Sequence, residues 1–234
     1  MFLRKLHKWL SLAIGIQVFL WVLSGCLISL FDAQTAGGRL TRQAIPEGSA
    51  LAEFGPLVGL GNLPLARKDV RSIALEPFFN QPVYRVALAD SKLLFDARTG
   101  RELIIDKPMA QRIALASYRG EGQLLDTQKL PQGSAEMRGV SGALWRSDFS
   151  DSLATRVYVS AQDGRVLAHR NNRWALVDFL LMLHFMDYER ADSFNNPQII
   201  IVTFATLWLT VSGFLLLFYS FSRRDFRWLQ KLRR

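Results

Sequence analysis

Histidine is the residue type in this sequence best suited to bind a metal or to change charge near neutral pH. The chain has three: His7 and His184 stand in apolar stretches near its two ends, and His169 stands in a strand-like stretch. A histidine beside an apolar segment can contact lipid headgroups, pack as a structural ring or ligate a metal. The function depends on which of these roles His7 and His184 have.

Other motifs that carry chemistry are missing from the sequence. Cys26 is the only cysteine, so there is no disulfide framework, no cysteine zinc site and no C-x-x-C-H attachment for covalent haem. The sequence also lacks a P-loop, a G-x-G-x-x-G turn after a strand, an H-E-x-x-H pair and a G-x-S-x-G nucleophile turn. These absences argue against a hydrolase, and any cofactor must be held by other groups.

Two uncharged apolar stretches are long enough to cross a membrane. Residues 9–31 carry no charge, and the uncharged run 193–222 contains a nearly continuous apolar block at 199–221. Each stretch is longer than the length of about 20 residues that a helix needs to span the hydrocarbon core. The first is also longer than the apolar core of about 7 to 15 residues in a cleaved signal peptide, so we expect an uncleaved membrane anchor.

The net charge of +9 is concentrated at the two ends of the chain. Residues 32–192 carry 20 basic and 19 acidic residues, whereas the rest of the chain carries nine basic residues and one acid. Because basic residues beside a span favour the cytoplasmic side, we expect both ends in the cytoplasm of a bacterial cell and the middle in the periplasm. No basic surface remains for a nucleic acid, so no nucleic-acid partner is expected.

Short strand-like runs fill residues 67–172, after a Gly- and Pro-rich linker at 32–66. The runs RSIAL, PVYRVAL and KLLFDA, and RELII after the turn RTG, come first. Helical spacing follows at 108–118, then a polar loop, then ALWRSDF, TRVYVSA and RVLAHR. Residues 84–103 and 155–169 form a weak internal repeat, because each has an Arg-Val strand start, a turn ending in Gly-Arg and a closing strand. The pattern predicts antiparallel strands with a helix.

The repeated unit, with its D-x-x-T-G-x-x-L hairpin between two strands, resembles the PepSY domain, a small α+β module. The first apolar segment, LHKWLSLAIGIQVFLWVLSG, is similar to the opening segment of PepSY-associated transmembrane proteins, a family that includes ferric-siderophore reductases. The resemblance covers most of the chain. It implies electron transfer across the inner membrane by haem b, which histidines on membrane helices would hold.

We therefore predict an α+β membrane protein in which two transmembrane helices flank a periplasmic PepSY-like domain of antiparallel strands and helices. The apolar run that begins near 173 is too short to span and is expected to form an interfacial helix. The predicted boundaries are a cytoplasmic N-terminus at 1–8, a transmembrane helix at 9–31, a linker at 32–66, the PepSY-like domain at 67–172, the interfacial helix at 173–192, a second transmembrane helix at 197–221 and a basic cytoplasmic tail at 222–234.

The resemblance places His7 on the histidine of the family's L-H-x-W opening and His184 on that of its L-H-F/T segment, so both are predicted to ligate haem iron. The alternatives are a headgroup contact for His7 and a structural ring for His184. Asp187, three residues after His184, is expected to bind the second ring nitrogen. Gln17 is expected in an interhelical hydrogen bond or at the edge of a cofactor, and Met186 is a candidate axial ligand.

One haem cannot join His7 and His184, because about 20 residues of helix, roughly 30 Å, separate the two predicted positions. Each histidine then needs a second axial group from a methionine, from a partner membrane subunit or from the same residue of a second copy in a homodimer. Small residues on both apolar segments would admit either a neighbouring helix or a flat macrocycle. They are Ala13, Gly15, Ser24, Gly25, Ser29, Ser212 and Gly213.

The predicted function is an inner-membrane electron-transfer or reductase component that passes electrons through haem b toward a periplasmic acceptor. A ferric chelate such as a ferric siderophore, or a flavoprotein, would serve as that acceptor. The alternative is a non-catalytic PepSY module that binds a partner enzyme or helps to assemble a membrane complex. A haem absorption spectrum of the purified protein separates these two functions.

Overall fold

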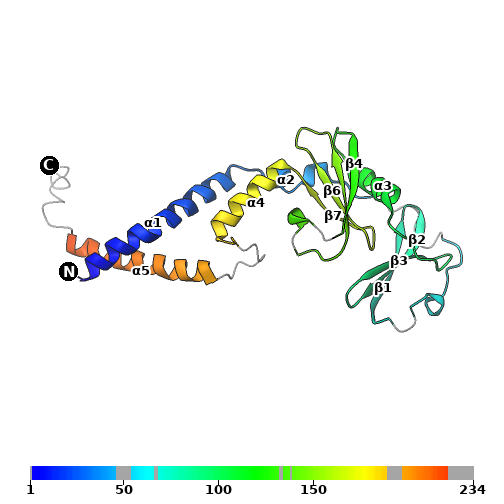
Figure 1. The fold of residues 1–234 in the computed structure, drawn as a ribbon, viewed down its shortest axis with the longest axis horizontal. Helices are drawn as coiled ribbons and strands as arrows, with labels where there is room; N and C mark the ends of the chain where they lie inside the picture. Colours follow the sequence, from blue (N-terminus) through cyan, green and yellow to red (C-terminus); the bar gives the residue numbers. More distant parts are fainter. Residues whose placement is uncertain are drawn as a thin grey trace, which may run out of the picture. The chain divides into compact units, whose positions relative to one another are not determined.

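The computed structural model describes residues 2–45, 54–65, 68–131, 134–137, 139–188 and 197–220 (Figure 1). Contacts between the elements divide the chain into two compact units. The helical unit is formed by Met1–Leu30 and Asp178–Arg234, and the globular unit is formed by Phe31–Val177.

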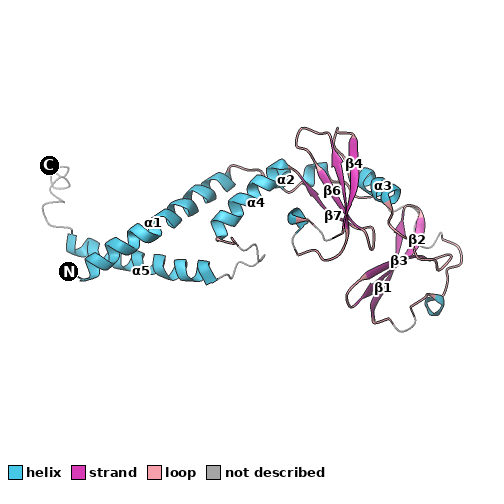
Figure 2. Ribbon diagram, in the orientation of Figure 1, coloured by secondary structure: helices cyan, strands magenta, loops and turns pink. Residues whose placement is uncertain are grey.

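The described part of the helical unit consists mainly of helices (Figure 2). The globular unit contains all the strands described, together with further helices. The longer helices are α1 (Phe2–Ser29), α3 (Lys107–Ser117), α4 (Asn172–Phe185) and α5 (Pro197–Ser220). The short ones are α2 (Ala33–Ala36) and the 3₁₀ turns Arg39–Thr41, Leu60–Asn62 and Ala135–Met137. The strands are β1 (Val70–Phe78), β2 (Gln81–Leu88), β3 (Lys92–Asp96), β4 (Leu124–Leu130), β5 (Leu144–Phe149), β6 (Arg156–Ser160) and β7 (Val166–Arg170).

The strands of the globular unit form two antiparallel meanders, β1-β2-β3 and β4-β5-β6-β7, within the residues described. This confirms the α+β class and the antiparallel strands predicted from the sequence. The prediction of a polar loop after α3 was wrong for Leu124–Leu130, which forms β4 and pairs with β5. β4 is an edge strand whose only buried side chain is Thr127, so its sequence lacks the apolar alternation of a strand with a covered face.

The D-A-R-T-G segment forms the turn that the sequence predicts after β3. The carboxylate of Asp96 accepts hydrogen bonds from the backbone amides of Arg98 and Thr99, at 2.7 and 3.1 Å. Gly100 completes the turn at a φ of 70°, a conformation that glycine adopts without steric cost. The strand predicted at RELII is reduced to a single bridge between Phe95 and Glu102.

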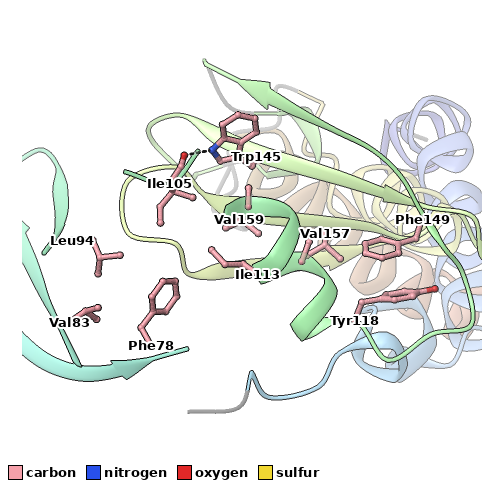
Figure 3. Close-up of a cluster of buried hydrophobic side chains, with 12 residues drawn as sticks. Phe78, Val83, Leu94, Ile105, Ile113, Tyr118, Trp145, Phe149, Val157 and Val159 are labelled. Atoms are coloured by element: carbon pink, nitrogen blue, oxygen red, sulfur yellow. Dashed lines mark hydrogen bonds between the residues drawn. The ribbon is translucent and has the colours of Figure 1, made fainter. Parts of the chain in front are cut away.

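The main core of the globular unit lies around α3 (Figure 3). Ile113 of α3 is fully buried, with side chains of the first sheet, such as Phe78, and of the second sheet, such as Val159, in the same cluster. The indole Nε1 of Trp145 donates a 2.8 Å hydrogen bond to the backbone carbonyl of Ile105. The helix starts where the sequence predicts, because Asp106 caps it and accepts from the amide of Met109, and Pro108 occupies its first turn.

In the helical unit, α5 is the helix of the described residues that is by itself long and apolar enough to cross a membrane, with a mean hydropathy of 2.2. α1 gives a second crossing if its parts Arg4–Leu12 and Ile14–Ser29, which meet at an angle of 50°, count as one span. α4 ends at Phe185, within the predicted interfacial segment. The predicted basic tail at 222–234 lies outside the described residues.

Candidate functional site

His7 lies on the first part of α1 and contacts α5. Its Nδ1 atom is 2.8 Å from the hydroxyl oxygen of Ser212, whose side chain is buried with an exposed fraction of 4%. A Cβ added to Gly213 would lie 3.2 Å from Cε1 of the His7 ring. The imidazole therefore rests directly on glycine backbone, and a larger residue at position 213 would displace it.

His184 lies near the end of α4 and makes the same kind of contact with α1. Its Nδ1 atom is 3.1 Å from the hydroxyl oxygen of Ser24 and 3.2 Å from the backbone carbonyl oxygen of Trp21. A Cβ on Gly25 would lie 3.1 Å from Cε1 of the ring. Ser24, like Ser212, is buried, with an exposed fraction of 2%.

The partners of the two rings determine where the imidazole proton sits. The hydroxyl of Ser24 donates to the carbonyl of Leu20 at 2.6 Å, and that of Ser212 donates to the carbonyl of Leu209 at 3.1 Å. Each serine oxygen is then left to accept from Nδ1–H of its histidine. For His184 the Trp21 carbonyl, which can only accept, requires the same tautomer. From these contacts we assign the ring proton of each histidine to Nδ1, which leaves the Nε2 lone pair available to a ligand.

Both histidines thus face a Ser-Gly dipeptide, L-S-G at 23–25 for His184 and V-S-G at 211–213 for His7. The sequence indicated these residues only as small ones that permit close helix contact. Their pairing with the histidines was missed, although the recurrence of Ser-Gly in the two apolar segments was a readable signal. The serine orients the ring through its hydrogen bond, and the glycine leaves space for the ring. A hydrogen bond to the other ring nitrogen is how proteins hold a histidine ligand in place.

Gln17 and Trp21 lie on the face of α1 that His184 contacts at Ser24, since these positions are four and three residues apart. The side-chain carbonyl of Gln17 accepts from the hydroxyl of Tyr188 at 3.4 Å. The side-chain nitrogens of Gln17 and Trp21 are buried and have no hydrogen-bond partner among the described residues. This face of α1 therefore presents two unsatisfied N–H donors.

Met186 and Asp187 follow α4 directly. Met186 is buried, with an exposed fraction of 3%, and adopts a φ of 51°. The backbone amide of Asp187 donates to the carbonyl of Met182 at 3.1 Å. Because Nδ1 of His184 has its partners on α1, orientation of this ring by Asp187 stays a prediction.

Comparison with known proteins assigns the chain to a protein family. The family model described as the PepSY-associated TM region matches residues 4–234. The chain belongs to this PepSY-associated family. No curated protein and no solved structure matches it. The resemblance seen in the L-H-K-W opening and the hairpin repeats is thereby confirmed for nearly the whole chain.

In this PepSY-associated protein the two histidine contacts are separate sites. His184 meets α1 at Ser24 and Gly25, so roughly 25 Å of helix at 1.5 Å per residue lies between that contact and His7. Within the described residues, no group of three or more His, Cys, Asp or Glu side chains is placed to hold a metal ion. Each site of the chain therefore offers one imidazole.

The third histidine of this PepSY-associated protein is bound at both ring nitrogens. Nε2 of His169 is 3.1 Å from the hydroxyl of Ser117, and Nδ1 is 3.3 Å from that of Thr41. Burial, together with the nearby Arg42 guanidinium, lowers the pKa of His169 to about 4. This ring is a neutral structural group in the globular unit, and it differs from His7 and His184 in having no nitrogen left for a ligand.

Two buried tyrosines of the globular unit, Tyr118 and Tyr158, also lack acid–base chemistry at neutral pH. Burial and a 2.7 Å hydrogen bond to the Asp151 carboxylate raise the pKa of Tyr118 to about 12. Burial, with the Glu136 carboxylate adding to it, likewise raises the pKa of Tyr158 to about 12. Both phenols stay protonated, so neither can serve as a general base or nucleophile near pH 7.

Proposed function

We propose that this protein is an inner-membrane electron-transfer component that binds haem b through His7 and His184. In this proposal both ends of the chain are cytoplasmic and the globular unit is periplasmic. Electrons pass toward a periplasmic acceptor, either a ferric chelate or a flavoprotein. The observation that carries the proposal is that Nδ1 of each ring contacts a buried serine hydroxyl, and for His184 also the Trp21 carbonyl, while Nε2 has no partner among the described residues.

The donor set of each site fits haem iron. Axial histidine ligates haem through one neutral ring nitrogen while the other nitrogen donates a hydrogen bond. His184 meets this requirement with the Trp21 carbonyl and Ser24, and His7 meets it with Ser212. Haem iron, when bound, would supply one-electron exchange between its ferrous and ferric states.

The residues around each ring would hold the imidazole in one orientation. A hydrogen bond from Nδ1–H to a carbonyl or hydroxyl oxygen fixes the tautomer and prevents the ring from rotating. Ser24 and Ser212 are held in turn, because each hydroxyl bonds a carbonyl of its own helix. The unsatisfied N–H donors of Gln17 and Trp21 offer hydrogen bonds to acceptor atoms of a bound group.

Each site needs a second axial ligand, since the chain supplies one imidazole to each. A two-fold homodimer would bring the same histidine of a second copy, and so two histidine pairs at different depths in the membrane. A methionine such as Met186, or a partner membrane subunit, would serve instead. One spectrum can address the type of the second ligand, because bis-histidine and His–Met haem differ in absorption.

The test is the visible spectrum of the full chain, expressed with ample haem and purified in detergent. We expect a Soret band and a reduced α-band of the b type. His184→Ala and His7→Ala should each remove about half of the haem per protein, because they remove separate sites. The matched control is His169→Gln, which changes the remaining histidine and should leave the haem content unaltered.

A folded, colourless protein obtained under full haem supply would overturn the proposal. It would favour the non-catalytic function, in which the PepSY-like unit binds a partner enzyme or assembles a membrane complex. Retention of all haem in the double variant His7→Ala/His184→Ala would also contradict it, because the iron would then have other ligands.

A further inference from the structure

A cavity of about 650 Å³ opens in the globular unit, and none of the residues of the two histidine contacts lines it. Its wall is made by the segment 39–45, the turn between β1 and β2, and the start of β7. Its volume falls in the range of about 300 to 1,000 Å³ that small-molecule sites occupy.

Positive charge is concentrated in this cavity. Four arginines line it, and Glu76 is the acidic residue among its described lining. Glu76 is shared by two of the arginines, at 2.6 Å from Nε of Arg85 and 2.9 Å from a terminal nitrogen of Arg165. The carboxylate of Asp163 lies 3.9 Å from Nε of Arg165 and 3.5 Å from Nζ of Lys92. Two carboxylates thus face three cations, which leaves one positive charge from this cluster before the other two arginines are counted.

The other two arginines, Arg39 and Arg42, are exposed on the segment that borders the cavity. Arg42 donates to the backbone carbonyl of Val166 at 3.3 Å, a contact that positions the guanidinium without neutralising it. Arg39 has no side-chain hydrogen bond or ion pair within the part of the chain that the structure describes. Both retain N–H donors for an anion, and the planar guanidinium binds carboxylate or phosphate oxygens in pairs.

Two phenylalanines, Phe78 and Phe79, line the same cavity. The guanidinium carbon of Arg85 lies 5.2 Å from the centre of the Phe78 ring. Phe79 and Asn80 form the two-residue turn between β1 and β2, with φ angles of 49° and 64°. A bulky residue rarely adopts positive φ, so Phe79 is held at the cavity against the preference of its backbone. Such outliers gather at ligand sites.

We infer that this cavity binds a small anion that carries two or more carboxylate or phosphate groups on a body with a flat apolar part. The arginines bind the acidic groups and the phenylalanines cover the apolar part. Residues 32–192, which include the globular unit, are nearly balanced in charge, so the positive field is local to the cavity and suits a small molecule rather than a long polyanion. This inference does not depend on haem binding.

The experiment is isothermal titration calorimetry of the full chain in detergent with three probes. Benzene-1,3,5-tricarboxylate has acidic groups and a flat ring, citrate has the acidic groups alone, and inorganic pyrophosphate represents the phosphate source. We expect the aromatic tricarboxylate to bind more tightly than citrate, and binding to weaken with added salt. Tighter binding of pyrophosphate than of both carboxylates would assign the site to phosphate.

Three variants are expected to lower, raise and leave unchanged the affinity for the best probe. Arg39→Gln/Arg42→Gln should weaken the best probe by about tenfold or more, which corresponds to about 1.4 kcal/mol. Glu76→Gln should strengthen it several-fold, because Arg85 and Arg165 lose the Glu76 carboxylate, which competes with the ligand, while the amide oxygen can still accept from them. The control, Arg71→Gln/Arg101→Gln, makes the same change in net charge at exposed positions outside the cavity and should leave the affinity unchanged.

Two results would overturn the inference. One is the absence of measurable heat for all three probes at millimolar concentration. The other is an equal loss of affinity in the cavity variant and in the charge-matched control, which would mean that the anion responds to net charge alone. Circular dichroism and the melting temperature of each variant show whether it is folded, so a loss of affinity cannot be confused with unfolding.

Discussion

Replacement of Gly25 by valine is expected to remove the haem that we propose His184 binds, about half of the haem per protein. A Cβ at this position already lies 3.1 Å from Cε1 of the ring, and valine adds two methyl groups to it. The ring must then move away from α1, which breaks its bonds to Ser24 and to the Trp21 carbonyl. A ligand displaced by even 1 Å loses its productive geometry. The haem-to-protein ratio, measured as the pyridine haemochrome, reports the loss.

α1 itself supplies the matched control. A Cβ on Gly15 would meet nothing within 4 Å, so Gly15→Val makes the same change in propensity and volume without touching a ring. Gly213→Val should act on the other site, because a Cβ there lies 3.2 Å from Cε1 of His7. Equal haem contents in Gly25→Val and Gly15→Val would show that the Ser-Gly contact does not position a ligand.

Acidification from pH 6.5 to about 4 is expected to lower the free energy of unfolding of the globular unit by on the order of 3 kcal/mol through His169 alone. The unfolded imidazole titrates near 6.5, whereas burial lowers the pKa in the folded state to about 4. Between these values the unfolded chain takes up a proton that the folded unit does not. Stability is therefore complete above pH 6.5 and falls as the pH is lowered through the window, by about 1.4 kcal/mol per pH unit.

Chemical denaturation of the full chain in detergent, followed by tryptophan fluorescence between pH 7 and 4.5, measures this loss. His169→Gln keeps hydrogen-bonding capacity toward Ser117 and Thr41 but cannot titrate, so the difference between wild type and variant isolates this ring. Burial of Asp151 opposes its ionisation, but hydrogen bonds from Thr155 and Tyr118 outweigh this and lower its pKa. Asp151 therefore contributes only at more acidic pH. An identical slope in both proteins between pH 6.5 and 5 would refute the prediction.

Much of the globular unit could be predicted from local pattern. The strands PVYRVAL and TRVYVSA alternate or cluster apolar residues, and the Asp-x-x-Thr-Gly turn has a composition that its geometry requires. β4 could not be predicted, because an edge strand with one buried side chain has no apolar period to read. The strained turn at Phe79 was equally hidden, since phenylalanine is not a residue that signals positive φ.

The histidine sites likewise combine features that the sequence shows with features that depend on tertiary contacts. Apolar length, the basic ends and the positions of the histidines can be read from the sequence alone, so they indicate the candidate spans and the two imidazoles without a fold. The partners of those imidazoles are decided by tertiary contact, because Ser24 is 160 residues from His184 and Ser212 is 205 residues from His7. No local pattern encodes which helix packs against which. The contact of each Nδ1 atom with its serine, on which the assignment of the ring proton rests, forms only once the helices have met.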